Sequence, residues 1–170
     1  MKSSTEAISK TRCTYFVGGS SGSGKSFTTR LVSEDLRLYR IELDEFYRVM
    51  RRVTDDEKVR VNATRGFVSA FIEKLLGLGV DCLIEGGWLD VASAAQIREK
   101  SGGRFHPIFC GYPDADVDQR LEVITKAGDH WLSHASVDSA RQWIAKEVEG
   151  SRWYKSECEK YRIPFMDFSD

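Results

Sequence analysis

The chain has 170 residues, of which 41% are hydrophobic and 30% charged, and its formal net charge at pH 7 is −1. This length suits one domain with its own core, and the balanced charge argues against a basic nucleic-acid-binding surface. No apolar run approaches the roughly 20 residues of a membrane span, and residues 1–12 lack the apolar segment of a secretory signal, so we expect a flexible tail followed by a single domain at 13–170.

Apolar, β-prone runs alternate with helical patterns along the chain. Strands are expected at residues 13–17, 38–43, 80–84, 105–112 and 163–168. Helices are expected at residues 27–36, 49–61, 65–78, 93–100, 117–124, 136–148 and 151–161. Such alternation predicts a three-layer α/β fold, with a parallel sheet covered by helices on both faces.

A glycine-rich segment lies between the first strand and the first helix. Gly19 to Ser26 reads G-x-x-x-x-G-K-S, the P-loop pattern. Its glycines allow a tight turn whose backbone N–H groups converge on phosphate, Lys25 reaches the outer phosphates, and the Ser26 hydroxyl binds Mg²⁺. The positive end of the following helix dipole favours the same anion. A chance glycine-rich turn is the alternative, but the strand–loop–helix context favours a nucleotide site made by Gly19, Ser20, Ser21, Gly22, Ser23, Gly24, Lys25, Ser26 and Phe27.

Two carboxylates follow expected strands. Asp44 ends the second strand and Glu85 the third, and ligands of parallel α/β sheets bind beyond the carboxyl ends of the strands. The segment 112–114 ends the fourth strand in the same way. Asp44 can instead cap a helix and Glu85 can instead be a turn residue, although a carboxylate directly after an apolar strand is costly without a cation.

These motifs together resemble the P-loop small-molecule kinases. Asp44-x-Phe46-Tyr47 and the apolar run ending in Glu85-Gly86 are similar to the uridine kinase and phosphoribulokinase group, and Gly18-Gly19-Ser20-Ser21 is similar to the loop of chloramphenicol phosphotransferase. The resemblance implies a P-loop NTPase fold with a five-stranded parallel sheet in the order 2-3-1-4-5 and a short helical lid at about 114–148.

The resemblance also implies residue roles. Asp44 would be the base that accepts the proton of the acceptor hydroxyl, and Arg120 would close over the transferring phosphoryl group from the lid. Glu85 would join Ser26 in holding Mg²⁺, with Asp44 as a further metal-ligand candidate. The acceptor site would draw on Asp44, Tyr47, Arg48, Arg65 and Trp88. Surface pairing of Arg120, or a solvated face for the other arginines, is the alternative reading.

The sequence therefore predicts a cytoplasmic, ATP- and Mg²⁺-dependent phosphotransferase that acts on a hydroxyl of a small molecule, as a monomer or homodimer and without nucleic-acid or membrane partners. The four separated cysteines, none in a C-x-x-C motif, suit a reducing compartment. A P-loop ATPase and a regulatory nucleotide-binding module remain open, as does the identity of the acceptor. His130 and His134 have the spacing of a metal pair, but the sequence places no third ligand beside them.

Overall fold

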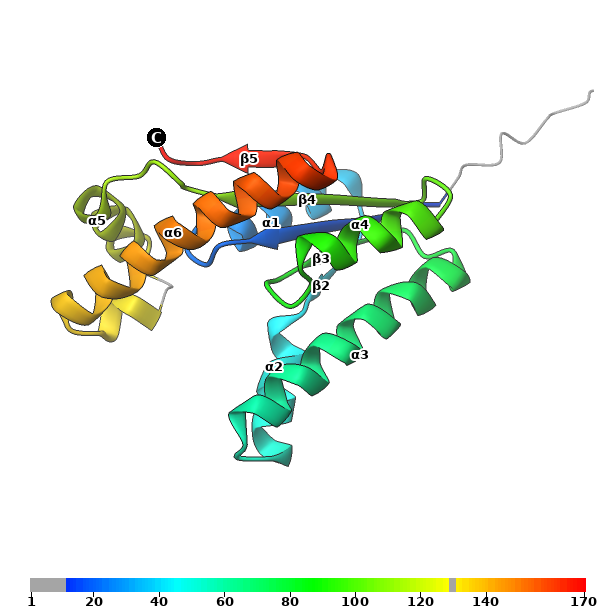
Figure 1. The fold of residues 1–170 in the computed structure, drawn as a ribbon, viewed down its shortest axis with the longest axis horizontal. Coiled ribbons are helices and arrows are strands. Elements are labelled where there is room, and N and C mark those ends of the chain that lie inside the picture. Colours follow the sequence, from blue (N-terminus) through cyan, green and yellow to red (C-terminus); the bar gives the residue numbers. More distant parts are fainter. Residues whose placement is uncertain (1–11, 129–130) are drawn as a thin grey trace, which may run out of the picture.

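A computed structural model describes residues 12–128 and 131–170 of the chain. Five parallel strands form one sheet in the order β2-β3-β1-β4-β5, as the resemblance implied (Figure 1). The strands are β1 (Thr14–Gly19), β2 (Tyr39–Glu42), β3 (Cys82–Glu85), β4 (Phe105–Gly111) and β5 (Phe165–Asp167).

Helices lie on both sides of this sheet, which confirms the predicted three layers. In Figure 1, α4 (Val91–Lys100) and α6 (Val137–Tyr161) lie in front of the strands and α1 (Lys25–Leu36) lies behind them. The helices α2 (Asp44–Val53) and α3 (Glu57–Leu78) pair with each other and extend beyond the sheet where they join, while the second half of α3 packs into the main core. At the opposite end lie α5 (Val117–Ala127), the 3₁₀ turn η1 (Trp131–His134) and the start of α6.

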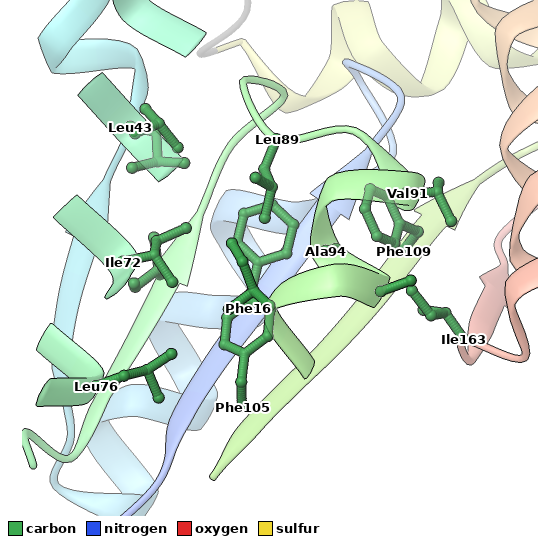
Figure 2. Packing of buried hydrophobic residues seen from close by; sticks show 14 of the residues in the cluster. Phe16, Leu43, Ile72, Leu76, Leu89, Val91, Ala94, Phe105, Phe109 and Ile163 are labelled. Carbon is green, nitrogen blue, oxygen red and sulfur yellow. The ribbon is translucent and has the colours of Figure 1, made fainter. Parts of the chain in front are cut away.

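The main core lies between the sheet and the helices α3, α4 and α6. Phe16 of β1 is fully buried, and its ring lies 6.2 Å from the Phe105 ring and 5.6 Å from the Phe109 ring of β4. Val91 and Ala94 of α4 cover these rings (Figure 2). Large buried aromatic and aliphatic groups stabilise by about 1.5–3 kcal/mol each, so this layer fixes the strands that carry the site.

The opposite face of the sheet is covered less completely. The alternate residues Tyr15, His106 and Met166 are exposed on it. Helix α1 buries the small polar Thr29 and Ser33 and leaves its large apolar side chains in solvent. An apolar cavity of about 250 Å³ lies between α1 and the strands.

The helix boundaries depart from the sequence prediction in two places. The expected short helix at 49–61 is divided, because α2 ends at Val53 and the Asp56 carboxylate accepts the Val59 amide to begin α3. The expected break near residue 150 is absent, since Gly150 sits inside the continuous 25-residue helix α6. No helix in the described parts of the chain is long and apolar enough to cross a membrane.

Candidate active site

The glycine-rich segment forms a loop between β1 and α1 that only glycine can start. Gly19 has a φ of 110°, and a Cβ there would lie 1.9 Å from the carbonyl oxygen of Cys110 on β4. The next amide, Ser20 N–H, donates to that oxygen at 2.9 Å. Gly24, with φ 84°, then brings the chain into α1, which begins at Lys25. The loop is therefore fixed to the sheet and ends on the positive pole of a helix, the arrangement that binds phosphate.

Lys25 lies within this loop, and its ammonium group donates to Ser20 O at 2.5 Å. Burial lowers the pKa of Lys25, while the charges of Cys110, Glu85, Asp44 and Glu147, in that order, raise it. Both carboxylates predicted from the strand ends thus act on the Lys25 ammonium. The fold brings the P-loop, Asp44 and Glu85 to the same edge of the sheet.

Glu85 is the last residue of β3 and is only 4% exposed. One carboxylate oxygen accepts the Ser26 hydroxyl at 3.1 Å, and the other accepts the Arg40 guanidinium at 2.7 Å. Burial raises the pKa of Glu85, and the bonds from Ser26 and Arg40 oppose that change. The buried carboxylate is therefore partly neutralised by protein groups.

The oxygens of Ser26 and Glu85 are suitable ligands for a magnesium ion. A serine hydroxyl and a carboxylate, the hard oxygen ligands that Mg²⁺ prefers, adjoin each other beside Lys25. The site offers few protein ligands, as Mg²⁺ sites completed by water and phosphate oxygens do. Asp44 makes no hydrogen bond to Ser26 or Glu85 in the described residues. The Ser26 and Glu85 pair suits the ion, and phosphate and water would supply its other ligands.

Asp44 is the first residue of α2, and its position is set by buried neighbours. Leu43 has no exposed surface and its amide donates to Glu85 O at 2.8 Å, which ties the start of α2 to the end of β3. Gly86, with φ 142°, permits this packing, because a Cβ there would lie 2.8 Å from the Leu43 Cβ. The Asp44 carboxylate accepts the indole N–H of Trp88 at 2.8 Å. Asp44 is thus held at the sheet edge by the backbone hydrogen bond of the preceding residue, Leu43, and by its own side chain.

The other predicted acceptor residues are only partly brought together. Tyr47 stacks on Trp88 with ring centroids 4.5 Å apart, next to the Asp44 carboxylate. Arg48 is 68% exposed and pairs with Glu45 on the same helix. Arg65 is exposed on α3 and acts electrostatically on Tyr154 of α6. The aromatic pair adjoins the candidate base, whereas neither arginine has a hydrogen bond or ion pair with Asp44 in the described part of the chain.

Arg120 of α5 reaches the P-loop backbone. Its guanidinium donates to Gly22 O at 2.6 Å and to Phe168 O at 3.2 Å, and it lies 4.3 Å from the centre of the Tyr112 ring. Burial lowers the pKa of Arg120. Its Nε atom is buried with no hydrogen-bond partner in the described residues. The predicted lid arginine therefore contacts the phosphate loop itself.

Sequence reasoning missed several groups that hold the loop. The Tyr112 hydroxyl donates to Ser21 O at 2.7 Å, and the Glu147 carboxylate accepts Ser21 N–H at 2.8 Å. Tyr112 stands at the strand end that the sequence marked for attention, whereas no motif marks Arg40 or Glu147. The metal pair weighed at His130 and His134 cannot be placed, since His130 lies outside the described residues. Within those residues no group of three or more potential metal-binding side chains occurs.

The strand order, the P-loop and the carboxylates at the strand ends define a P-loop kinase-like protein. The chain belongs to the AAA domain family AAA_33, whose family model matches residues 15–146. A search of the curated proteins found no match.

Solved structures of small-molecule kinases share the fold. A gluconokinase from Sinorhizobium meliloti 1021 is 16% identical with a TM-score of 0.59, and the alignment covers 94% of this chain and 85% of that chain. A shikimate kinase from Bacteroides thetaiotaomicron is 12% identical with a TM-score of 0.57, covering 93% and 88%. A shikimate kinase from Acinetobacter baumannii, solved with shikimate, is 13% identical with a TM-score of 0.56, covering 95% and 86%. At these identities the likeness concerns the fold.

Proposed function

We propose that the chain is an ATP- and Mg²⁺-dependent kinase that transfers the γ-phosphoryl group to a hydroxyl of a small-molecule acceptor. The observation that carries the proposal is the convergence of Lys25, Glu85 and Asp44 at one edge of the sheet, directly beside the P-loop. The fold shared with gluconokinase and shikimate kinase supports it.

On the nucleotide side, the amides of the P-loop and Lys25 would hold the β- and γ-phosphates. Ser26 and Glu85 would hold Mg²⁺, whose charge offsets the negative charge that develops during transfer. Phosphoryl transfer depends mainly on positioning and charge neutralisation, so these groups and one aligned carboxylate suffice. Arg120 would act from a lid formed by α5, η1 and the start of α6, and its contact with Gly22 O places it next to the loop.

On the acceptor side, Asp44 would accept the proton of the attacking hydroxyl. The Trp88 N–H fixes one carboxylate oxygen and leaves the other to meet the substrate. The stacked Tyr47 and Trp88 rings would form an apolar wall for that substrate. Gluconokinase and shikimate kinase suggest a small polyhydroxy or hydroxy acid as the first acceptor class to test.

An ATPase without an acceptor is the second candidate function. The observation that favours it is the position of Glu85 beside Ser26, where a carboxylate can orient water as well as a metal. Hydrolysis of ATP would give no role to Asp44 and its aromatic neighbours, so we favour the kinase over the ATPase.

Calorimetric titration with MgATP and MgADP, followed by an ADP-release assay against hydroxyl-bearing metabolites and antibiotics, tests the proposal. A kinase binds both nucleotides and releases ADP only when an acceptor is present. Equal ADP release with and without acceptors would identify an ATPase, and binding with no turnover would identify a regulatory module.

A further inference from the structure

Helix α6 crosses the P-loop at close range near its middle. Ser151 has no exposed surface, and its Oγ lies 2.8 Å from the Ser20 Oγ and 2.7 Å from the Glu147 carbonyl oxygen. The same Oγ accepts the Tyr112 amide at 3.0 Å. Gly111 of β4 allows this close approach, since a Cβ there would lie 2.7 Å from the Ser151 Oγ. One turn of α6 is thus bonded both to the loop and to the segment after β4.

Glu147, in this turn, holds the loop directly. Its carboxylate accepts Ser21 N–H at 2.8 Å, while the carbonyl of the same residue, Ser21, accepts the Tyr112 hydroxyl at 2.7 Å. Arg120 binds the next carbonyl, that of Gly22, at 2.6 Å. In the outer arm of the P-loop, Ser20 to Gly22, three side chains from separate parts of the chain therefore fix Ser21 and Gly22, and Ser151 contacts Ser20.

The chemistry of Glu147 differs from that of an ordinary structural contact. Burial raises the pKa of its carboxyl, and the Ser21 amide and the Lys25 ammonium oppose that rise. A carboxylate that is partly withdrawn from water carries a desolvation cost, and it would repel a bound polyphosphate. The hydrogen bond from the Ser21 amide offsets part of this cost and fixes the loop.

We propose that Glu147 is a positioning residue for nucleotide binding, acting through Ser21 to hold the outer arm of the P-loop in its phosphate-binding shape. The inference rests on the proposed nucleotide site and concerns a residue that no motif marks. A loop whose amides are already oriented does not lose conformational freedom when phosphate binds, so its affinity is higher. It is the hydrogen-bond acceptor, and not the negative charge, that the nucleotide site needs at this position.

Two substitutions of Glu147 distinguish the effect of its hydrogen-bond acceptor from the effect of its negative charge. Glu147→Gln keeps an oxygen that can accept Ser21 N–H and removes the charge, whereas Glu147→Ala removes both. Glu149→Ala, at an exposed position on the same helix, is the control. Calorimetric titration with MgADP, in the absence of any acceptor substrate, measures the dissociation constant of the nucleotide. Circular dichroism and thermal melting establish that each variant is folded.

We expect Glu147→Ala to raise the Kd for MgADP about tenfold, the effect of losing one hydrogen bond to a charged group. Glu147→Gln should bind MgADP as tightly as the wild type or more tightly, and Glu149→Ala should match the wild type. If Glu147→Ala does not fold, Glu147→Asp replaces it, because the shorter side chain withdraws the acceptor from Ser21, and the same loss is expected.

The inference is wrong if Glu147→Ala binds MgADP within twofold of the wild type, or if Glu147→Gln is as weak as Glu147→Ala. Failure of the kinase proposal has a different signature. A wild-type protein that binds MgADP in the expected pattern but phosphorylates no acceptor refutes only the transfer reaction. A wild-type protein that does not bind MgADP refutes both.

Discussion

The two sides of the candidate site are built differently. On the nucleotide side, the loop from Gly19 to Ser26 is bonded to β4, α5 and α6. Glu85 beside it is buried, and Lys25 within it is half-buried. On the acceptor side, the Asp44 carboxylate has a single hydrogen bond within residues 12–128 and 131–170, from Trp88, and Arg48 and Arg65 are exposed.

This difference matches what each side must recognise. A polyphosphate needs a preformed set of donors, which many contacts can hold in place. In the proposed function, the acceptor would instead be recognised by side chains on and beside the helix pair α2 and α3. We therefore expect substitutions on the nucleotide side to abolish binding, and substitutions on the acceptor side to leave nucleotide binding intact while they slow transfer.

Lys25→Ala should have the largest effect. It removes the ammonium group from the loop, and the loss of one such charge in a phosphoryl-transfer site is expected to lower turnover by about a thousandfold. Calorimetry should detect almost no MgATP binding, while Lys74→Ala, an exposed lysine on α3, should behave as wild type. Near-normal MgATP affinity in Lys25→Ala would remove this residue from the phosphate site.

Asp44→Asn should slow phosphoryl transfer and leave nucleotide binding almost unchanged. Its amide cannot accept the proton of the acceptor, so transfer should fall by about a hundredfold or more while the Kd for MgATP changes less than about threefold. Single-turnover phosphoryl transfer and calorimetry measure the two quantities, with the exposed Asp55→Asn as control. Unchanged transfer would exclude Asp44 as the base.

Glu85→Gln should weaken Mg²⁺ binding more than nucleotide binding. Loss of the carboxylate charge beside Ser26 should raise the Mg²⁺ concentration for half-maximal turnover about tenfold, as the loss of a metal-binding or supporting group does. Glu42→Gln is the matched control, because Glu42 also pairs with Arg40 but lies outside the proposed metal site. An equal Mg²⁺ requirement in all three proteins would assign Glu85 a purely structural role.

Trp88→Phe should have the smallest effect. It keeps an aromatic ring to stack on Tyr47 and removes the N–H that orients Asp44, so kcat should fall between about three- and tenfold with the nucleotide Kd unchanged. Trp153→Phe, at a half-exposed tryptophan on α6, controls for loss of an indole. A change confined to KM for the acceptor would instead indicate that Trp88 binds substrate without orienting Asp44.

The sequence predicted the fold and the nucleotide side because both depend on local patterns. Gly19, Gly24 and Lys25 are contiguous with a strand and a helix, and Asp44 and Glu85 each follow an apolar run, so the rule for parallel sheets brings them together. The predicted break between the helices at 136–148 and 151–161 includes Gly150, a residue type that usually weakens a helix. The structure keeps α6 intact there, and a Cβ at this position would lie 4.0 Å from the Ser20 Oγ of the P-loop, an ordinary contact distance.

The remaining contacts could not be predicted, since they join residues far apart in the chain. Arg40 meets Glu85 only because β2 and β3 are paired, and Glu147 meets Ser21 across 126 positions. Each of these residues is an ordinary charged residue in its own segment. Only the packing of α6 and the register of the strands show what they touch.

The fate of the γ-phosphoryl group tests the central claim most directly. Phosphorus NMR of wild-type protein with MgATP and a pool of polyhydroxy acids, sugars and hydroxyl-bearing metabolites distinguishes a phosphate ester from free phosphate. Our account predicts ADP and a new phosphomonoester signal in equal amounts, and the loss of that signal in Asp44→Asn. Inorganic phosphate alone, or an ester signal that persists in Asp44→Asn, would contradict it.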